Sequence, residues 1–218
     1  MRSLSERLTI LALKVILRMH SFAYSWAGRL GKKLEQDGLH PKHRIMNYHQ
    51  FFVDNVCEND TVLDIGCGNG ALTYDVAKKA KKVVGIDLNE QNITSAKNMF
   101  SRENIEYIHG DALTDLPNEK FDVIILSNVL EHIDKRVEFL NTVKKLAPKF
   151  LIMVPMLNRS WIDIYKKELG LEYRLDRTHF IEYTLEGFNK ELGEAGLTVF
   201  DYSVQFGEIW SVLEIAND

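Results

Sequence analysis

The stretch that decides the fold is Val62-Leu63-Asp64-Ile65-Gly66-Cys67-Gly68-Asn69-Gly70. Its apolar beginning, interrupted only by Asp64, predicts a buried strand, and the glycines at every second position predict a sharp turn into a helix that opens at Ala71. Because glycine has no Cβ, such a turn presents bare backbone N–H groups and a helix N-terminus to a ligand that approaches closely. The stretch therefore predicts a ligand-binding turn.

Two nucleotide-binding folds use a turn of this kind. The dinucleotide fingerprint is G-x-G-x-x-G, with a pyrophosphate at the helix N-terminus. Here the spacing is G-x-G-x-G, and the preceding Asp64 would repel a pyrophosphate but attract a cationic group. The stretch resembles the first motif of the class I S-adenosylmethionine-dependent methyltransferases, D-x-G-x-G-x-G, from Asp64 through Gly70. A dehydrogenase and a purely structural glycine turn are the alternatives.

Two further predicted strands also lead to acids. The strand over residues 82–87 ends at Asp87, whose carboxylate can accept hydrogen bonds from both hydroxyls of a ribose. The strand over residues 105–109 leads to Asp111, where the family places an acid beside the adenine amino group. Asp87 could instead cap the next helix, although Asn89 suits that role better, and Asp111 could be a turn residue.

The resemblance implies S-adenosylmethionine as cofactor and S-adenosylhomocysteine as product. It places Asp64, Gly66 and Gly68 at the methionine end, and Ser127 or Asn128 at the close of the methionine side. Asp87 with Leu88 should hold the ribose and adenine, and Ala112 should join Asp111 at the adenine edge. The residues expected to bind the cofactor are, in full, Asp64, Gly66, Cys67, Gly68, Gly70, Asp87, Leu88, Asp111, Ala112, Ser127 and Asn128.

The order of the predicted elements indicates an α/β fold. Strands are predicted near 61–66, 82–87, 105–109, 121–127 and 149–154, with helices near 70–79, 89–101 and 131–146. This alternation predicts a parallel sheet covered on both faces. A helix over 184–195, ended by Gly196, precedes strands near 197–204 and 207–215 that predict an antiparallel hairpin. The resemblance implies a Rossmann-like, seven-stranded, mostly parallel sheet with an antiparallel C-terminal edge strand and helices on both faces.

The chain length of 218 residues fits one domain with an appendage. We expect an N-terminal amphipathic helical appendage and cleft wall over residues 1–56, and a methyltransferase domain over 57–218. Residues 156–183 lie after the fifth strand and are dense in aromatic and ionisable side chains. They are the expected substrate lid.

Residues 3–33 are predicted to form an amphipathic helix. Ser3, Arg7, Lys14, Arg18, Ser21, Ser25, Arg29 and Lys32 share one line of a helical wheel, within about 40°. Lys14 and Arg18 interrupt the apolar run, so a membrane span of about 20 apolar residues is not expected, and a signal peptide is not expected either. Three interpretations stay open: the helix contacts a membrane surface, packs in a homodimer, or covers the main domain.

Charge and cysteine content limit the partners. Residues 1–50 carry nine basic and three acidic residues (9 − 3 = +6), whereas residues 51–218 carry 18 and 28 (18 − 28 = −10). The acidic main domain argues against a nucleic-acid substrate. Two cysteines predict a reducing cytoplasm, with peripheral contact on the inner face of the membrane if the N-terminal helix binds lipid. No metal site is expected, because His40, His43 and His49 have no acid or cysteine at ligand spacing beside them.

Candidate catalytic residues follow from the chemistry of methyl transfer. A general base is needed only when the acceptor loses a proton, and histidine titrates near neutrality. His132 and His179 are therefore candidate bases and Glu182 is a third, although His132 could merely pack at a helix start and His179 could be a structural hydrogen-bonding residue. The candidate substrate residues are Arg44, Tyr48, Trp161, Arg177 and Tyr183.

The sequence thus predicts a methyltransferase that acts on a small-molecule or lipid-linked acceptor, with oxygen favoured as the accepting atom. The alternatives are a non-catalytic cofactor-binding or scaffold protein and an NAD-dependent dehydrogenase. The acceptor, the use of a general base and the oligomeric state stay open.

Overall fold

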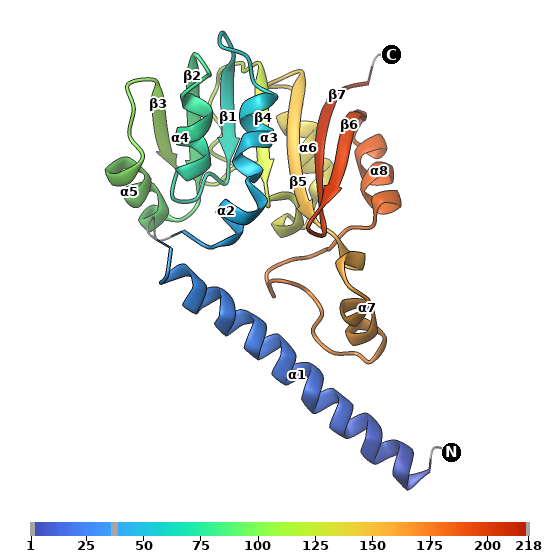
Figure 1. Ribbon diagram of the computed structural model, residues 1–218. Helices are drawn as coiled ribbons and strands as arrows, with labels where there is room; N and C mark the ends of the chain where they lie inside the picture. The colour runs from blue at the N-terminus through green and yellow to red at the C-terminus, as the bar shows by residue number, and fades with distance from the viewer. Residues whose placement is uncertain (1–2, 36–38, 217–218) are drawn as a thin grey trace.

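The protein was analysed as a computed structural model that describes residues 3–35 and 39–216. A seven-stranded sheet with the order β3-β2-β1-β4-β5-β7-β6 forms its centre (Figure 1). The strands are β1 (Thr61–Ile65), β2 (Lys82–Asp87), β3 (Ile105–His109), β4 (Val123–Ser127), β5 (Lys149–Pro155), β6 (Leu197–Gln205) and β7 (Glu208–Ile215).

The first five strands are parallel, and β7 runs antiparallel to β5. This confirms the expected mostly parallel sheet with one reversed C-terminal strand. The position of that strand differs from the expectation in one respect. Because β6 pairs only with β7, the reversed strand lies one place inside the sheet, and β6 forms the edge.

Helices cover both faces of the sheet. On one face lie α3 (Tyr48–Asp54), α4 (Ala71–Ala77) and α5 (Glu90–Met99), and on the other lie α6 (Arg136–Val143) and α8 (Leu185–Glu194) (Figure 1). Alternation along β4 shows why both faces need cover: Val123 and Ile125 pack with α3 and α4, whereas Ile124 and Leu126 pack with α6 and α8. A parallel strand that is apolar on both sides requires two helical layers.

Local signals in the sequence set several helix ends. The Asn89 side chain accepts hydrogen bonds from the N–H groups of Gln91 and Asn92 at the start of α5, as expected of an N-cap. Gly196 follows α8 with a φ of +70°, as expected of a glycine just beyond a helix C-terminus.

Two helical stretches are interrupted in the structure. The stretch after Pro41 divides at Asn47, whose φ of +48° is left-handed, into α2 (Lys42–Met46) and α3. The helix expected near 131–146 begins as a separate 3-10 turn, η1 (Leu130–His132), and resumes as α6. Ile133 between them is extended, and the Arg136 guanidinium donates to its carbonyl, which removes that acceptor from a continuous helix.

Helix α1 (Leu4–Lys32) and the segment over residues 156–183 lie beyond the carboxyl ends of β4 and β5 (Figure 1). A capping box between Ser3 and Glu6 starts α1. The segment contains a short turn, η2 (Leu157–Arg159), and α7 (Trp161–Glu168), which runs beside α1. Across residues 3–35 and 39–216, no helix combines the length and the apolar content that a membrane span requires.

Candidate active site

The glycine turn after β1 is held against the end of β2. Both Gly66 N–H and Cys67 N–H donate to the Ile86 carbonyl, at 2.8 and 3.1 Å. A Cβ on Gly70 would lie 2.5 Å from the Tyr107 hydroxyl, so this glycine is required for packing. Gly68 has a φ of +56°, and a Cβ placed on it would meet no atom within 4 Å. The turn is therefore packed at its end and open at Gly68, where a ligand can approach the backbone.

Asp64 lies beneath this turn rather than on its surface. Its side chain is buried and accepts a hydrogen bond of 2.6 Å from the Thr73 hydroxyl on α4. Burial, with a smaller contribution from the nearby Asp87, raises the pKa of Asp64 to about 7 against the opposing hydrogen bond from Thr73. The hydrogen bond ties the end of β1 to α4 and fixes the turn between them.

Asp87 and Leu88 adjoin the open side of the turn. Asp87 Oδ2 accepts from Gly68 N–H at 2.8 Å, and Oδ1 accepts from Asn89 N–H and the Asn92 amide. The Leu88 side chain is 69% exposed, and its carbonyl contacts His109 Nε2 at 3.1 Å. An acid beside an exposed apolar side chain suits a ribose and the face of an adenine.

Asp111 lies in the loop after β3. Its Oδ1 accepts from Leu113 N–H, and its own N–H donates to Asp115. Asp111 thus forms the turn that the sequence analysis gave as the alternative to a contact with adenine. Ala112 packs against the edge of the core beside it.

Polar side-chain atoms without partners gather at the carboxyl end of β4 and the start of β7. In the described part of the chain, the buried side-chain atoms that lack a hydrogen-bond partner are Asn128 Oδ1, both carboxylate oxygens of Glu131, Glu208 Oε2 and Trp210 Nε1. Asn128 N–H donates to the Met153 carbonyl, Met153 pairs with Trp210, and Pro155 pairs with Glu208. Buried polar groups are normally paired, so this concentration marks a site for a polar ligand.

Glu131, His132 and His179 meet next to these atoms. The ligand-capable atoms of the three side chains all lie within 4.8 Å of one another, and the two imidazole rings pack edge-on with centroids 4.6 Å apart. A hydrogen bond of 2.8 Å from Phe180 N–H to the Glu131 carbonyl holds the segment over 156–183 in this place. Burial, with smaller contributions from Glu208 and Glu182, raises the pKa of Glu131 to about 8. Burial and the neighbouring His179 lower the pKa of His132.

A second layer of residues orients both imidazoles. His132 Nδ1 lies 2.9 Å from the Thr178 hydroxyl, which donates to Asp176. His179 Nδ1 lies 3.4 Å from Glu182 Oε1. Although burial raises the pKa of Glu182, its bonds to His179, to Leu175 N–H and to the Arg159 guanidinium bring the net pKa below the usual value. Glu182 therefore lies behind His179 and positions it.

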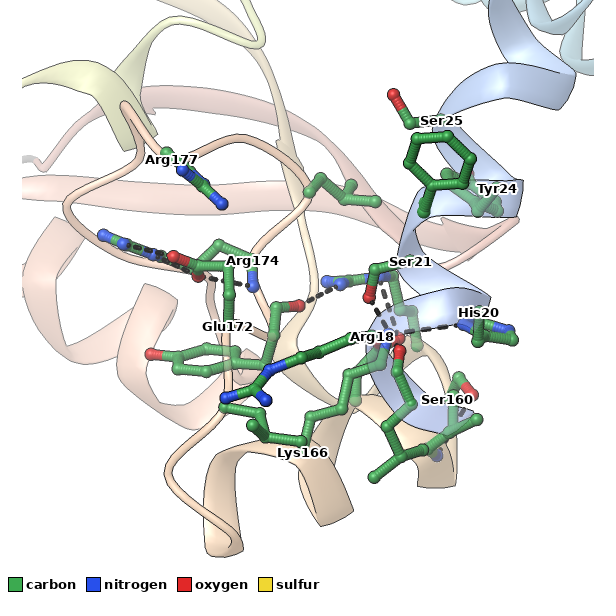
Figure 2. Close-up of a pocket in the computed structure, with 18 of the residues that line it drawn as sticks. Arg18, His20, Ser21, Tyr24, Ser25, Ser160, Lys166, Glu172, Arg174 and Arg177 are labelled. Atoms are coloured by element: carbon green, nitrogen blue, oxygen red, sulfur yellow. Dashed lines mark hydrogen bonds and ion pairs between the residues drawn. The ribbon is translucent and has the colours of Figure 1, made fainter. Parts of the chain in front are cut away.

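A pocket of about 980 Å³ opens between α1 and the segment over 156–183. Figure 2 shows Arg18, His20 and Tyr24 of α1 facing Lys166, Arg174 and Arg177. The basic side chains of its lining are Arg18, Arg29, Arg159, Lys166, Arg174 and Arg177, against the acids Asp163 and Glu172. Arg159 connects the pocket to the cluster, because it also binds Glu182.

Four of the five expected substrate residues lie outside the lining of this pocket, and Arg177 alone belongs to it. Tyr48 is buried with its hydroxyl 3.0 Å from His43 Nδ1, and Tyr183 is buried with its hydroxyl bonded to Glu191. Arg44 pairs with Glu35 at 2.9 Å, and Trp161 starts α7 with 74% of its side chain exposed. The two buried tyrosines serve packing here, and the sequence could not distinguish packing from lining.

Sequence analysis did not identify Glu131, Glu208, Trp210 or Arg159 as site residues. The available signal for Glu131 was its place directly before His132, just beyond the end of the central strand. Glu208 and Trp210 come 77 or more positions later (208 − 131 = 77), and only the pairing of β7 with β5 brings them near.

Comparison with known proteins agrees with this geometry. Residues 57–163 match a family described as "Methyltransferase domain". A ubiquinone biosynthesis O-methyltransferase of Bartonella tribocorum is 37% identical over 123 residues, which cover 54% of this chain and 49% of that protein. This chain therefore spans about half the length of the curated relatives it matches.

Solved structures share the fold at low identity. An S-adenosylmethionine-dependent methyltransferase from Clostridium acetobutylicum has a TM-score of 0.64 at 16% identity, over 89% of this chain and 100% of that chain. The complex of DhpI with S-adenosylhomocysteine has a TM-score of 0.64 at 13% identity, over 96% and 98%. With the motif, the strand order and the family match in agreement, this chain contains a class I S-adenosylmethionine-dependent methyltransferase domain.

Proposed function

We propose that this protein transfers a methyl group from S-adenosylmethionine to a hydroxyl oxygen of an amphiphilic, lipid-linked acceptor. The observation that carries the proposal is the gathering of unpartnered buried polar atoms, from Asn128 to Trp210, beside the glycine turn. These atoms lie where β4, β5 and β7 meet, at the edge where open α/β sheets bind ligands.

The cofactor side of the site fits a sulfonium nucleoside. Open space over Gly68 suits close approach of the ligand to the backbone, and Asp87 beside it suits the ribose hydroxyls. Asn128 has a left-handed backbone with a φ of +56° and a buried, unpartnered Oδ1. That oxygen would accept a hydrogen bond from the ammonium group of the methionine moiety.

The lining of the pocket supports a negatively charged amphiphile as the methyl acceptor. Six basic and two acidic side chains line the pocket between α1 and the 156–183 segment, beside Leu17, Phe22 and Ile162. Its volume of about 980 Å³ is at the upper end of the range for small-molecule sites, about 300–1,000 Å³. Mixed basic and apolar lining suits a headgroup joined to an apolar chain.

S-Adenosylmethionine supplies a methyl carbon that the positive sulfonium has already activated. The chain's own residues therefore have to hold the acceptor oxygen in line with that carbon, and such positioning accounts for about 7–11 kcal/mol of a barrier. His132 and His179 would receive the proton of the hydroxyl, which contributes about 10²–10⁴-fold. Glu182 would orient His179 without touching the acceptor.

Oxygen is favoured over nitrogen or carbon on two grounds. The histidines at the carboxyl end of β4 suit an acceptor that loses a proton, and the relatives over this domain are named O-methyltransferases. The cluster also faces the 156–183 segment, which adjoins the charged pocket.

Calorimetric titration with S-adenosylmethionine, S-adenosylhomocysteine and NAD tests the cofactor first. We expect binding of the two sulfur nucleotides alone. A methyl-transfer assay then compares a catechol bearing a long alkyl chain with the same catechol without the chain. The alkyl catechol should be preferred, and this preference should fall when Ile162 of the apolar lining is replaced by Ala.

Binding of NAD would replace this proposal with a dehydrogenase. Binding of the sulfur nucleotides without transfer to any hydroxyl acceptor would favour a non-catalytic scaffold, and equal transfer to both catechols would remove the lipid-linked acceptor.

A further inference from the structure

The three side chains of Glu131, His132 and His179 form a compact set of metal-ligand atoms. One ligand atom from each lies within 4.8 Å of the other two. Tetrahedral zinc sites with bonds of about 2.1 Å place ligand atoms about 3.4 Å apart, so these atoms need to close by at most about 1.4 Å. Rotation of side chains can supply a movement of that size.

The hydrogen-bonding partners of the two imidazoles occupy Nδ1 in both rings and leave Nε2 available. Thr178 contacts His132 at Nδ1, and Glu182 contacts His179 at Nδ1. In both rings Nε2 is then the nitrogen that can face an ion. Metal-binding histidines commonly use one nitrogen for the metal and the other for a carboxylate, carbonyl or hydroxyl partner. The Glu182–His179 and Asp176–Thr178–His132 contacts have this form.

The third ligand is an independent sign of a cation. Glu131 is fully buried, and neither of its carboxylate oxygens has a partner among residues 3–35 and 39–216. Burying a carboxylate is costly unless it is paired with a cation or with hydrogen-bond donors. Arg159, the nearby buried guanidinium, is already engaged by Glu182 and Asp163.

We propose that Glu131, His132 and His179 bind a divalent transition-metal ion, with Zn²⁺ as the best-fitting example. Two imidazoles with one carboxylate are a set that zinc and non-haem iron sites use, and imidazole disfavours Mg²⁺ and Ca²⁺, which select oxygen ligands. Three protein ligands leave at least one coordination position for an exogenous oxygen.

A hydroxyl bound to such an ion would lose its proton to solvent water more readily, so with the ion in place the imidazoles would act as ligands instead of proton acceptors. The activation of the acceptor by the ion rests on the proposed function. Metal binding does not rest on it, because binding is measured without methyl transfer.

The test uses untagged full-length protein stripped with a chelator. Equilibrium dialysis against Zn²⁺ at micromolar free concentration, followed by elemental analysis, should give one ion per chain. Glu131→Gln, which keeps the shape but removes the charge, and His179→Asn should each weaken binding by more than tenfold. Thr178→Val should weaken it by about tenfold or more through His132. Glu138→Gln and His109→Asn, outside the cluster, are the matched controls.

Two measurements keep the result clear if a variant is unstable. Co²⁺ bound to the wild type should show visible d–d absorption that Glu131→Gln lacks. Zn²⁺ should raise the thermal midpoint of the wild type but not that of Glu131→Gln. Absence of binding to the wild type, or equal binding to Glu131→Gln and His179→Asn, overturns the inference. Binding without methyl transfer to any acceptor would refute the proposed function and leave the metal site standing.

Discussion

Asp87 Oδ2 accepts a hydrogen bond of 2.8 Å from the backbone N–H of Gly68. The acid at the end of β2 and the middle glycine of the turn after β1 thus form one unit, although 19 residues separate them. The bond orients the open side of the turn. Oδ1 already accepts two hydrogen bonds, from Asn89 and Asn92, so Oδ2 keeps the lone pair that can accept a donor from a ligand.

Gly68→Ala should weaken S-adenosylmethionine binding by at least about tenfold, equivalent to about 1.4 kcal/mol. A Cβ at this position meets no protein atom within 4 Å, so it would occupy the space through which the ligand reaches the backbone. Calorimetric titration of the folded variant measures the change.

Gly170→Ala is the matched control for backbone strain. Gly170 has a φ of +66° and likewise no atom within 4 Å of an added Cβ, but it lies after α7, away from the turn. Its stability should fall about as much as that of Gly68→Ala, with affinity unchanged. Equal losses of affinity in both variants would show that strain, not ligand contact, explains the effect.

The stability difference between wild type and Asp64→Asn should depend on pH. The pKa of Asp64 is raised from 3.8 to about 7 in the folded protein, so the folded state holds its proton more tightly than the unfolded state. The wild type therefore loses stability relative to the variant as pH rises from about 4 through 7. The total is about 4 kcal/mol from three pKa units. Urea unfolding at several pH values measures it.

For Asp75→Asn, the stability difference between wild type and variant should change with pH in the opposite direction. Hydrogen bonds from His49 and Lys78, against a smaller effect of burial, lower the pKa of Asp75, so its contribution is present above its ordinary pKa and is lost as pH falls. A flat difference for Asp64→Asn over pH 4–7 would mean that the buried carboxyl is not perturbed as described.

Arg159→Met should destabilise the protein by about 3–5 kcal/mol, the range for breaking a buried ion pair on one side. The variant leaves the fully buried carboxylate of Glu182 without its guanidinium and frees the Met156 and Tyr173 carbonyls that Arg159 also binds. Urea unfolding followed by circular dichroism gives the free energy of unfolding.

Two further variants separate the ion pair from general effects. Adding Glu182→Gln to Arg159→Met should restore part of the loss, because it removes the uncompensated charge. Lys82→Met breaks the exposed pair with Glu119 and should cost no more than about 1 kcal/mol. A similar small loss for Arg159→Met would contradict the structural role assigned to this pair.

The exposed apolar stripe of α1 should bind anionic vesicles. The stripe consists of Leu4, Leu8, Leu11, Val15, Met19, Phe22, Trp26 and Leu30, all largely exposed. Arg7, Lys14, Arg18 and Arg29 lie along one side of it, and each base near an anionic surface contributes about 1 kcal/mol. The protein should co-sediment with vesicles that contain anionic lipid, less so at high salt, and Leu11→Glu/Phe22→Glu should abolish this.

Phe200→Glu is the control, since Phe200 is 73% exposed on β6, far from α1 in the chain. It should pellet as the wild type does. If the double variant also pellets fully, α1 is not the contact. If nothing pellets and light scattering gives a dimer that Leu11→Glu/Phe22→Glu dissociates, the stripe is a dimer interface.

The seven strands were predictable because their signals are local. Strands β1, β2, β4 and β5 are short, mostly apolar runs, and the glycines of residues 66–70 and the cap Asn89 act on their immediate neighbours. Helix interruptions were less predictable. Asn47 and Ile133 end helical segments through a left-handed backbone and a side-chain contact, respectively, which apolar periodicity does not register.

The sequence by itself determined the sheet, the ligand-binding turn and the acids at the strand ends, because hydrophobic periodicity and glycine geometry act over a few residues. The tertiary structure decided which polar groups became a site. It buried Glu131 without a partner, brought His179 to His132 across 47 positions (179 − 132 = 47), and set Glu182 behind the imidazole. Burial and proximity depend on how distant elements pack, and no local pattern carries that information.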